Sequence, residues 1–215
     1  MSILVVAGGP KANWPRLDHT DYEYFVGVDR GAWFIAEQGW PLDLAVGDFD
    51  SLSDTERLRV LDLSKEVHTS HPEKDDTDTQ LALQQVLDKF PQGRVTIIGA
   101  TGGRLDHFLA NLWLPLEERF QPFAHQITLM DQQNTITYHL PGEHTIYKEQ
   151  GKDYLAYCCL TPVTELTLRD SKYLLDRQQV ATPFSYSSNE FVGETAFFSF
   201  TSGVIAVIQS SDSAE

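Results

Sequence analysis

The first half of this 215-residue chain contains short, largely apolar runs, and each is followed at once by a glycine or an aspartate. The four runs cover residues 3–7, 24–28, 44–46 and 95–98. Strands that are apolar on both faces are typical of a parallel sheet, which is covered on both sides. Before the last run, Leu83, Val86, Leu87 and Phe90 stand at helical spacing behind the capping-box sequence Thr77-Asp78-Thr79-Gln80. This alternation of strand and helix predicts an α/β layer fold.

The pattern changes after about residue 122. Strand-like segments then follow one another without a long helical pattern between them, at residues 126–131, 135–140, 154–160, 163–168, 194–200 and 204–209. Turn residues separate many of them, which is typical of an antiparallel sandwich or barrel. We therefore expect two domains, an α/β domain over residues 1–124 and an all-β domain over residues 125–215.

The composition narrows the possible partners. Sixteen Lys and Arg against 31 Asp and Glu give a net charge of −15, which argues against sequence-independent binding of nucleic acid. A phosphate ligand remains possible, because bound metal cations can supply positive charge. Cys158 and Cys159 are neighbours and would point to opposite faces of a strand, so we expect reduced thiols and a cytoplasmic protein. No apolar run approaches the roughly 18 residues that a membrane helix needs, so no membrane partner is expected.

Acidic residues gather where the predicted strands end or helices begin. Asp29 follows the second run, Asp48 and Asp50 follow the third, and Asp75 and Asp78 open the capped helix. Parallel strands would bring these carboxylates to one edge, where ligands of open α/β sheets bind. Oxygen ligands without His or Cys suit Mg²⁺ that is shared with substrate phosphates. A single Asp such as Asp29 is more often a turn or cap residue, whereas Asp-x-Asp after a buried strand favours a functional site.

A glycine-rich segment, residues 99–107, follows the fourth run and leads into another helical pattern. Gly102 and Gly103 would let backbone N–H groups approach a phosphate at a helix N-terminus, and Arg104 offers a planar charged fork for phosphate oxygens. Asp106 would either hold that arginine or join a metal site. The alternative is a glycine turn with a local Arg–Asp surface pair, because the spacing matches neither the Walker A pattern nor a dinucleotide fingerprint.

Four segments in this order resemble the thiamine pyrophosphokinase (thiamin diphosphokinase) family: residues 28–32 (VDRGA), 47–51 (GDFDS), 74–78 (KDDTD) and 101–107 (TGGRLDH). Residues 187–191 (SSNEF) and 201–205 (TSGVI) are similar to the C-terminal substrate-binding segments of that family. The resemblance extends from about Val5 to Val207. It implies a Rossmann-like, parallel-sheet nucleotide-binding domain followed by a β-sandwich that binds thiamine. It also implies a homodimer with its sites between subunits.

The resemblance further implies the reaction and its residues. ATP and thiamine would give AMP and thiamine diphosphate, with Mg²⁺ as the cofactor. The family's residues map onto this chain as metal ligands (Asp29, Asp48, Asp50 and Asp78, with Asp75 close by), nucleotide contacts (Gly102, Gly103, Arg104 and Asp106) and thiamine contacts (Ser188 and Asn189).

Three positions depart from the family pattern. Arg30 stands where many eukaryotic members have Asp or Gly, and either a phosphate contact or a surface position would explain it. Lys74 replaces a Gln of some members and is a second candidate for the ATP phosphates. Tyr173 is the nearest candidate for the aromatic residue that stacks on thiamine.

The expected mechanism is attack of the thiamine hydroxyl on the β-phosphorus of ATP, whose triphosphate is bound by Mg²⁺ ions that Asp48, Asp50, Asp78 and also Asp29 are expected to hold. Asp78 or Asp75 is the candidate for the proton acceptor. Two alternatives stay open. Asp48-Phe49-Asp50 also resembles the nucleophile motif of an aspartate-dependent phosphohydrolase. A non-catalytic nucleotide- or thiamine-binding regulator is the other, although it has little need for four carboxylates.

Overall fold

The computed structural model describes residues 1–69 and 75–212. The chain forms two compact units, which are described here one at a time. The first comprises Met1–Leu114 and Gln126–Gln132, and the second comprises Pro115–His125 and Gln133–Glu215. The units therefore interleave around the boundary expected between residues 124 and 125. Among the described residues, none of the helices has the length and apolar character needed to cross a membrane.

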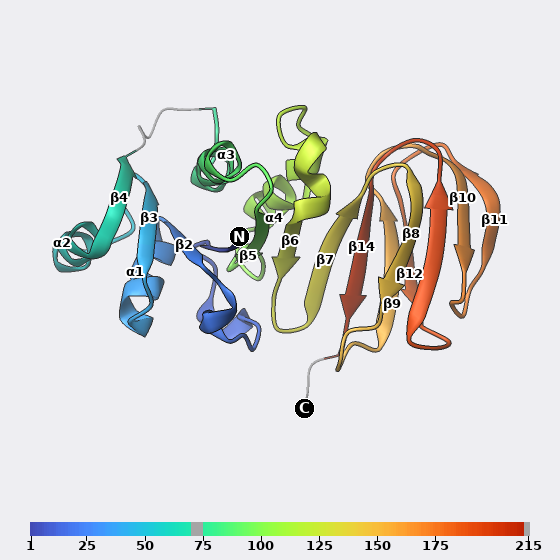
Figure 1. Ribbon diagram of the computed structural model, residues 1–215, viewed down its shortest axis with the longest axis horizontal. Coiled ribbons are helices and arrows are strands. Elements are labelled where there is room, and N and C mark those ends of the chain that lie inside the picture. Colours follow the sequence, from blue (N-terminus) through green and yellow to red (C-terminus); the bar gives the residue numbers. More distant parts are fainter. Residues whose placement is uncertain (70–74, 213–215) are drawn as a thin grey trace. The chain divides into compact units, whose positions relative to one another are not determined.

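The first unit is built on a parallel sheet with the strand order β6-β5-β1-β2-β3-β4 (Figure 1). Its strands are β1 (Ser2–Val6), β2 (Tyr24–Val28), β3 (Leu42–Gly47), β4 (Ser64–Thr69), β5 (Arg94–Ile98) and β6 (Ile127–Met130). Its α-helices are α1 (Arg30–Gln38), α2 (Asp54–Leu63), α3 (Asp78–Lys89) and α4 (Leu105–Leu112), with short 3₁₀ turns η1 (Lys11–Asn13), η2 (His19–Asp21) and the start of η3 (Leu114–Leu116). The α/β class expected for the first half is confirmed.

The apolar runs fill the core of this unit because both faces of the central strands are covered. Leu4 and Val6 of β1 join Ala32 and Ile35 of α1 and Val60 of α2 in one buried cluster. Helix α3 packs against β2 and β3. It begins with the predicted capping box, in which the Thr77 hydroxyl and the Gln80 side chain each accept a hydrogen bond from the other residue's backbone N–H.

The strand order creates a topological switch point beside β1. The chain passes from β1 through β2 and β3 to β4 on one side, and then returns to β5 on the other side of β1. In open α/β sheets, ligands bind outside the carboxyl ends of the strands at such a point. The turns after β1 and β5 are therefore the first place to look for a site.

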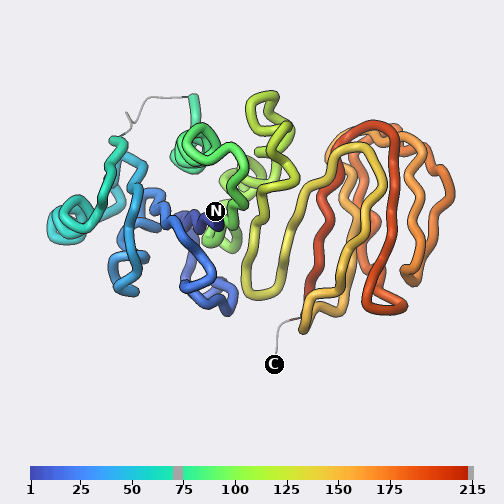
Figure 2. The backbone as a smooth tube through the Cα atoms, viewed as in Figure 1, coloured from blue at the N-terminus to red at the C-terminus, as the bar shows by residue number. Residues whose placement is uncertain are grey.

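The second unit is a β-sandwich of two antiparallel sheets (Figure 1). One sheet has the order β12-β9-β14-β7 and the other has the order β11-β10-β13-β8. The strands are β7 (Asn134–His139), β8 (Gly142–Tyr147), β9 (Tyr154–Cys159), β10 (Val163–Arg169), β11 (Leu175–Val180), β12 (Phe184–Asn189), β13 (Thr195–Phe200) and β14 (Ile205–Ser210), preceded by η4 (Gln121–Gln126). Inward side chains of both sheets, such as Tyr157, Val207, Leu166 and Phe198, share one core. The up-and-down path of these strands is visible in the chain trace (Figure 2).

Two sequence expectations need correction. The strand expected over residues 126–131 exists as β6, but it pairs in parallel with β5 and so completes the first sheet instead of opening the sandwich. Strands β4, β8, β11 and β12 were not expected, because most of their residues are polar and exposed. An exposed strand lacks the apolar alternation by which strands are recognised.

Candidate active site

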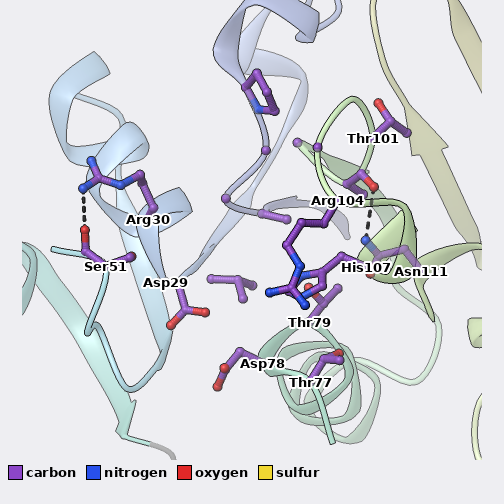
Figure 3. A pocket seen from close by; sticks show the side chains of 18 residues that line it. Asp29, Arg30, Ser51, Thr77, Asp78, Thr79, Thr101, Arg104, His107 and Asn111 are labelled. Atoms are coloured by element: carbon purple, nitrogen blue, oxygen red, sulfur yellow. Dashed lines mark hydrogen bonds between the residues drawn. The ribbon is translucent and has the colours of Figure 1, made fainter. Parts of the chain in front are cut away.

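A cavity of about 440 Å³ opens at the carboxyl ends of the parallel strands (Figure 3). The turns after β1, β2 and β5 and the first turns of α3 and α4 contribute to its lining. Its lining residues are Ala7, Gly8, Gly9, Pro10, Val28, Asp29, Arg30, Ser51, Thr77, Asp78, Thr79, Gly99, Ala100, Thr101, Gly103, Arg104, His107 and Asn111. The cavity therefore lies at the switch point that the strand order identifies.

Two turns of the cavity wall are in direct contact through backbone atoms. The Gly9 N–H donates to the Gly99 carbonyl over 2.8 Å, and a Cβ at Gly9 would stand only 2.3 Å from that carbonyl oxygen. Only glycine allows this approach. On the α4 side, the buried Asn111 Nδ2 donates to the Ala100 carbonyl over 3.2 Å and holds the turn after β5. Glycine turns thus form part of the cavity wall, and turns of this kind suit a phosphate ligand.

The acidic turns after β2 and β3 meet at this edge. The Asp29 N–H donates to the Val46 carbonyl over 2.9 Å, and a Cβ at Gly47 would lie 1.9 Å from Asp29 Oδ1. Asp48 Oδ1 accepts from the Asp50 N–H at 3.1 Å, so these two residues form a tight turn. Asp29 (φ 48°) and Phe49 (φ 58°) both have left-handed backbone conformations, which are unfavourable for non-glycine residues and concentrate at functional sites.

The start of α3 supplies the remaining predicted acids. Asp78 is the first helical residue and lines the cavity together with Thr77 and Thr79. Figure 3 shows Asp29 and Asp78 near each other on one side of the cavity, with the extended Arg104 side chain on the other side. Asp75 is exposed on the segment before the helix. Lys74 lies outside the described residues.

The glycine turn after β5 leads into Arg104, one of the two arginines that line the cavity. Arg104 forms a two-point ion pair with Asp106, with Nε–Oδ1 at 3.1 Å and Nη2–Oδ2 at 2.5 Å. The Arg104 guanidinium and the His107 N–H hold the pKa of Asp106 below its usual range. Both side chains are well exposed, at 72% for Arg104 and 62% for Asp106, so the pair orients Arg104 without burying it. Gly102 has φ 75°, and a Cβ there would collide with the Asn13 side chain at 1.7 Å.

The carboxylates fit a metal ion that is shared with a ligand. Among the described residues, no three His, Cys, Asp or Glu side chains are grouped closely enough to hold a metal by themselves. Mg²⁺ in phosphate-transfer sites commonly takes only one or two carboxylates and completes its shell with water and substrate oxygens. Asp29 and Asp78 line the cavity and could supply such ligands, whereas Asp48 and Asp50 stand on the adjoining turn and are not among the lining residues.

In the second unit, Asn189 is buried at 2% exposure and its carboxamide makes four hydrogen bonds. Its Oδ1 accepts from the Tyr173 and Glu190 N–H groups, both at 2.9 Å. Its Nδ2 donates to the Tyr173 carbonyl at 2.9 Å and to Ser171 Oγ at 3.3 Å. These bonds hold the Ser171–Tyr173 turn, and Tyr173 itself remains 57% exposed. Ser188, at φ 57°, is exposed at the end of β12.

The structure also adds site residues that sequence reasoning missed. Gly8 and Gly9, which follow the first apolar run, were not proposed for the site, and neither were Ser51, Thr79, His107 and Asn111. The Gly-Gly pair directly after the first strand was the available signal. Ser51 and His107 stand in two of the segments that resemble the family, and Thr79 stands in the capping box, whereas Asn111 depends on long-range packing and carries no local pattern.

Comparison with known proteins agrees with this geometry. The family description "Thiamin pyrophosphokinase, catalytic domain" matches residues 16–127, which is more than half of the chain, and "Thiamin pyrophosphokinase, vitamin B1 binding domain" matches residues 143–205. The chain belongs to the thiamin pyrophosphokinase family.

Individual members of the thiamin pyrophosphokinase family match along their whole length. The chain is 37% identical to thiamine pyrophosphokinase of Bacillus subtilis, over 98% of this chain and 99% of that protein. A thiamin pyrophosphokinase family protein from Enterococcus faecalis has 57% identity and a TM-score of 0.97, covering 99% of this chain and all (100%) of the other. The solved structure of the Bacillus subtilis enzyme has 35% identity and a TM-score of 0.85, with coverage of 99% and 100%.

Proposed function

We propose that this protein is a thiamine diphosphokinase that transfers the pyrophosphoryl group of ATP to the hydroxyl of thiamine. The observation that carries the proposal is the cavity at the switch point, which is lined by glycine turns together with Asp29, Asp78 and Arg104. Backbone N–H groups and an arginine suit a polyphosphate, while the carboxylates suit its metal ion. Membership of the thiamin pyrophosphokinase family, with full-length relatives, supports the choice of thiamine as the acceptor.

The triphosphate would lie against the Gly102–Gly103 turn with Arg104 at its oxygens, and Asp106 would keep Arg104 extended. Asp29, Asp48, Asp50 and Asp78 would hold Mg²⁺, which neutralises charge on the phosphates. The thiamine hydroxyl oxygen forms a bond to the β-phosphorus, the bond from that phosphorus to the α,β-bridging oxygen breaks, and AMP leaves with that oxygen. Asp78 or Asp75 would accept the hydroxyl proton.

Thiamine would be bound by the domain of residues 125–215, and ATP by the domain of residues 1–124. Tyr173 offers an exposed aromatic face for a cationic ring, and its backbone is fixed by Asn189. Ser188 lies directly before Asn189 and is exposed to a ligand. In this arrangement Asn189 contributes by holding Tyr173 in place, because its own amide groups are already hydrogen bonded.

We further propose a cytoplasmic homodimer with sites between subunits. Helix α4 presents Leu105, Leu109 and Trp113 on one exposed face, next to the cavity-lining Arg104 and His107. A second subunit covering that face would reach the cavity. The free thiols of Cys158 and Cys159 suit a reducing compartment. Light scattering on a sizing column tests the dimer, and a monomer at micromolar concentration would contradict it.

The assay that tests the function uses purified protein with ATP, Mg²⁺ and thiamine, followed by separation of nucleotides and thiamine esters. We expect thiamine diphosphate and AMP in equal amounts, both lost on addition of EDTA. ADP with thiamine monophosphate would show a simple kinase instead. Free phosphate without a thiamine ester would favour the phosphohydrolase, and thiamine binding without any product would favour the regulator.

A further inference from the structure

Arg30 lines the cavity, yet its guanidinium is engaged elsewhere. Nη2 donates to the Ser51 carbonyl, and Nη1 lies 3.6 Å from Glu56 Oε1. Figure 3 shows the Arg30 side chain directed to Ser51, whereas Arg104 extends into the cavity. The first residue of α1 is thus tied to the segment that follows β3.

Glu56 connects this contact to the start of α2. Its Oε2 accepts from the Ser53 N–H at 2.8 Å and from Ser53 Oγ at 2.9 Å, which completes a capping box. The Ser53 backbone and hydroxyl bonds, and then the charge of Arg30, hold the pKa of Glu56 below its usual range. Arg30 therefore contacts a group that is itself fixed by a helix cap.

The turn that Arg30 closes is the acidic turn after β3. Phe49 anchors its middle, because this side chain is 1% exposed in the core cluster, while its backbone has a positive φ. Such strained conformations persist only where the surroundings determine them. Ser51 lies at the far end of the turn, and its carbonyl is the atom that Arg30 binds. The Asp48–Asp50 turn is consequently fixed in its middle by Phe49 and at its far end by the bond from Arg30 to Ser51.

We propose that Arg30 is a positioning residue that fixes Asp48 and Asp50 through Ser51 and Glu56, and that it is not a phosphate contact. The part of this inference that concerns catalysis rests on the proposed function. An arginine suits this role because its planar fork donates in two directions at once, whereas a lysine is a single point charge. Arg30 would thus set how well the acidic turn binds Mg²⁺.

The test compares Arg30→Lys, Glu56→Gln and the double variant, with Arg57→Lys on the exposed face of α2 as the control. Glu56→Gln keeps a residue that caps the helix and removes only the charge facing Arg30. We expect Arg30→Lys to raise the Mg²⁺ concentration for half-maximal activity roughly three- to tenfold, because contacting residues couple strongly. Glu56→Gln should shift it in the same direction, and the double variant should resemble Arg30→Lys alone.

A second readout needs no activity. Hydrogen exchange of the amides in residues 48–52 should become faster in Arg30→Lys and Glu56→Gln and stay unchanged in Arg57→Lys. A phosphate contact predicts the opposite set of results, namely a higher KM for ATP at saturating Mg²⁺ in Arg30→Lys and no effect of Glu56→Gln. Those results, or unchanged exchange in both variants, would overturn the inference.

The two proposals fail separately. A wild-type protein that makes no thiamine diphosphate refutes the proposed function, while the exchange experiment still decides whether Arg30 fixes the turn. An active wild type whose variants keep normal Mg²⁺ dependence and exchange refutes only the role of Arg30.

Discussion

The two units place their polar groups in opposite ways. In the first unit, the cavity wall consists of backbone turns and of charged side chains such as Asp78 and Arg104 that face an open space. In the second unit, the polar Asn189 is buried, and its carboxamide is hydrogen bonded to the Ser171–Tyr173 turn and to the Glu190 N–H. The first arrangement presents charged side chains at the wall of a cavity, and the second fixes the backbone of an exposed aromatic residue. Substitutions in the two regions should therefore affect different quantities.

The largest effect is expected at the acidic turn. Asp50→Ala should lower kcat at least about a hundredfold, because groups that stabilise transferred charge contribute on that scale. Because the Asp50 side chain is exposed, the melting temperature should change little. The control is Asp62→Ala, which removes an exposed acid on helix α2 and should keep full activity. Near-normal turnover in a folded Asp50→Ala protein would remove Asp50 from the metal site.

Gly9→Ala should affect both stability and activity. The added Cβ would stand 2.3 Å from the Gly99 carbonyl oxygen, so the two turns must separate. Overpacking of this kind costs about 1–3 kcal/mol. Urea unfolding measures the loss, with Gly193→Ala as the matched control because nothing lies within 4 Å of a Cβ there. Equal stability of the two variants would show that the turns after β1 and β5 are not in close contact.

Asn189→Ala should act on thiamine binding more than on turnover. Four hydrogen bonds to a buried carboxamide are lost and their partners are left unsatisfied, which destabilises the turn by about 2 kcal/mol. We expect a higher KM for thiamine with an unchanged KM for ATP. Ser188→Gly is the comparison, since it relieves a positive φ at the neighbouring exposed residue. A Ser188→Gly protein with the same loss would show that Ser188, and not the fixed turn, determines thiamine affinity.

The smallest effect is the dependence of stability on pH, and it concerns the second unit alone. Burial, followed by the neighbouring His144, lowers the pKa of His139 to about 3. Between pH 6.5 and about 3, the unfolded chain therefore binds more protons than the folded one. The contribution of His139 to the free energy of unfolding is fully present above pH 6.5 and is lost as the pH decreases through this range. The slope is at most about 1.4 kcal/mol per pH unit.

Urea unfolding of the wild type and of His139→Phe at pH 7, 6 and 5 measures this slope. Phenylalanine suits the site, because His139 packs edge-on against Phe198 at 5.2 Å. We expect a flatter pH profile in the variant. Identical profiles would assign the acid sensitivity to other groups.

The sequence predicted the elements whose pattern is local. The runs of β1, β2, β3 and β5 were recognised because both faces are buried, and the Thr77–Gln80 box located the start of α3. Strands β4 and β11 were missed, since their exposed polar residues resemble loops. At the site, Asp78 and Arg104 were predicted from their place at a helix start or after a strand, whereas Asp29 by itself favoured a turn or cap residue and was assigned to the metal only through the family resemblance. The bond from Arg30 to Ser51 joins residues 21 apart in sequence and leaves no trace in either segment.

The late position of β6 has a consequence for synthesis on the ribosome. This strand pairs with β5, but it follows residues 115–125, which belong to the second unit. The pairing of β5 with β6 therefore cannot form until residue 130 has left the exit tunnel, although strands β1 to β5 have already been made. A protein that is truncated or cleaved near residue 124 would leave β5 without its partner β6. An unpaired strand edge of this kind is a template for aggregation. Separate expression of the catalytic half should accordingly extend through Gln132.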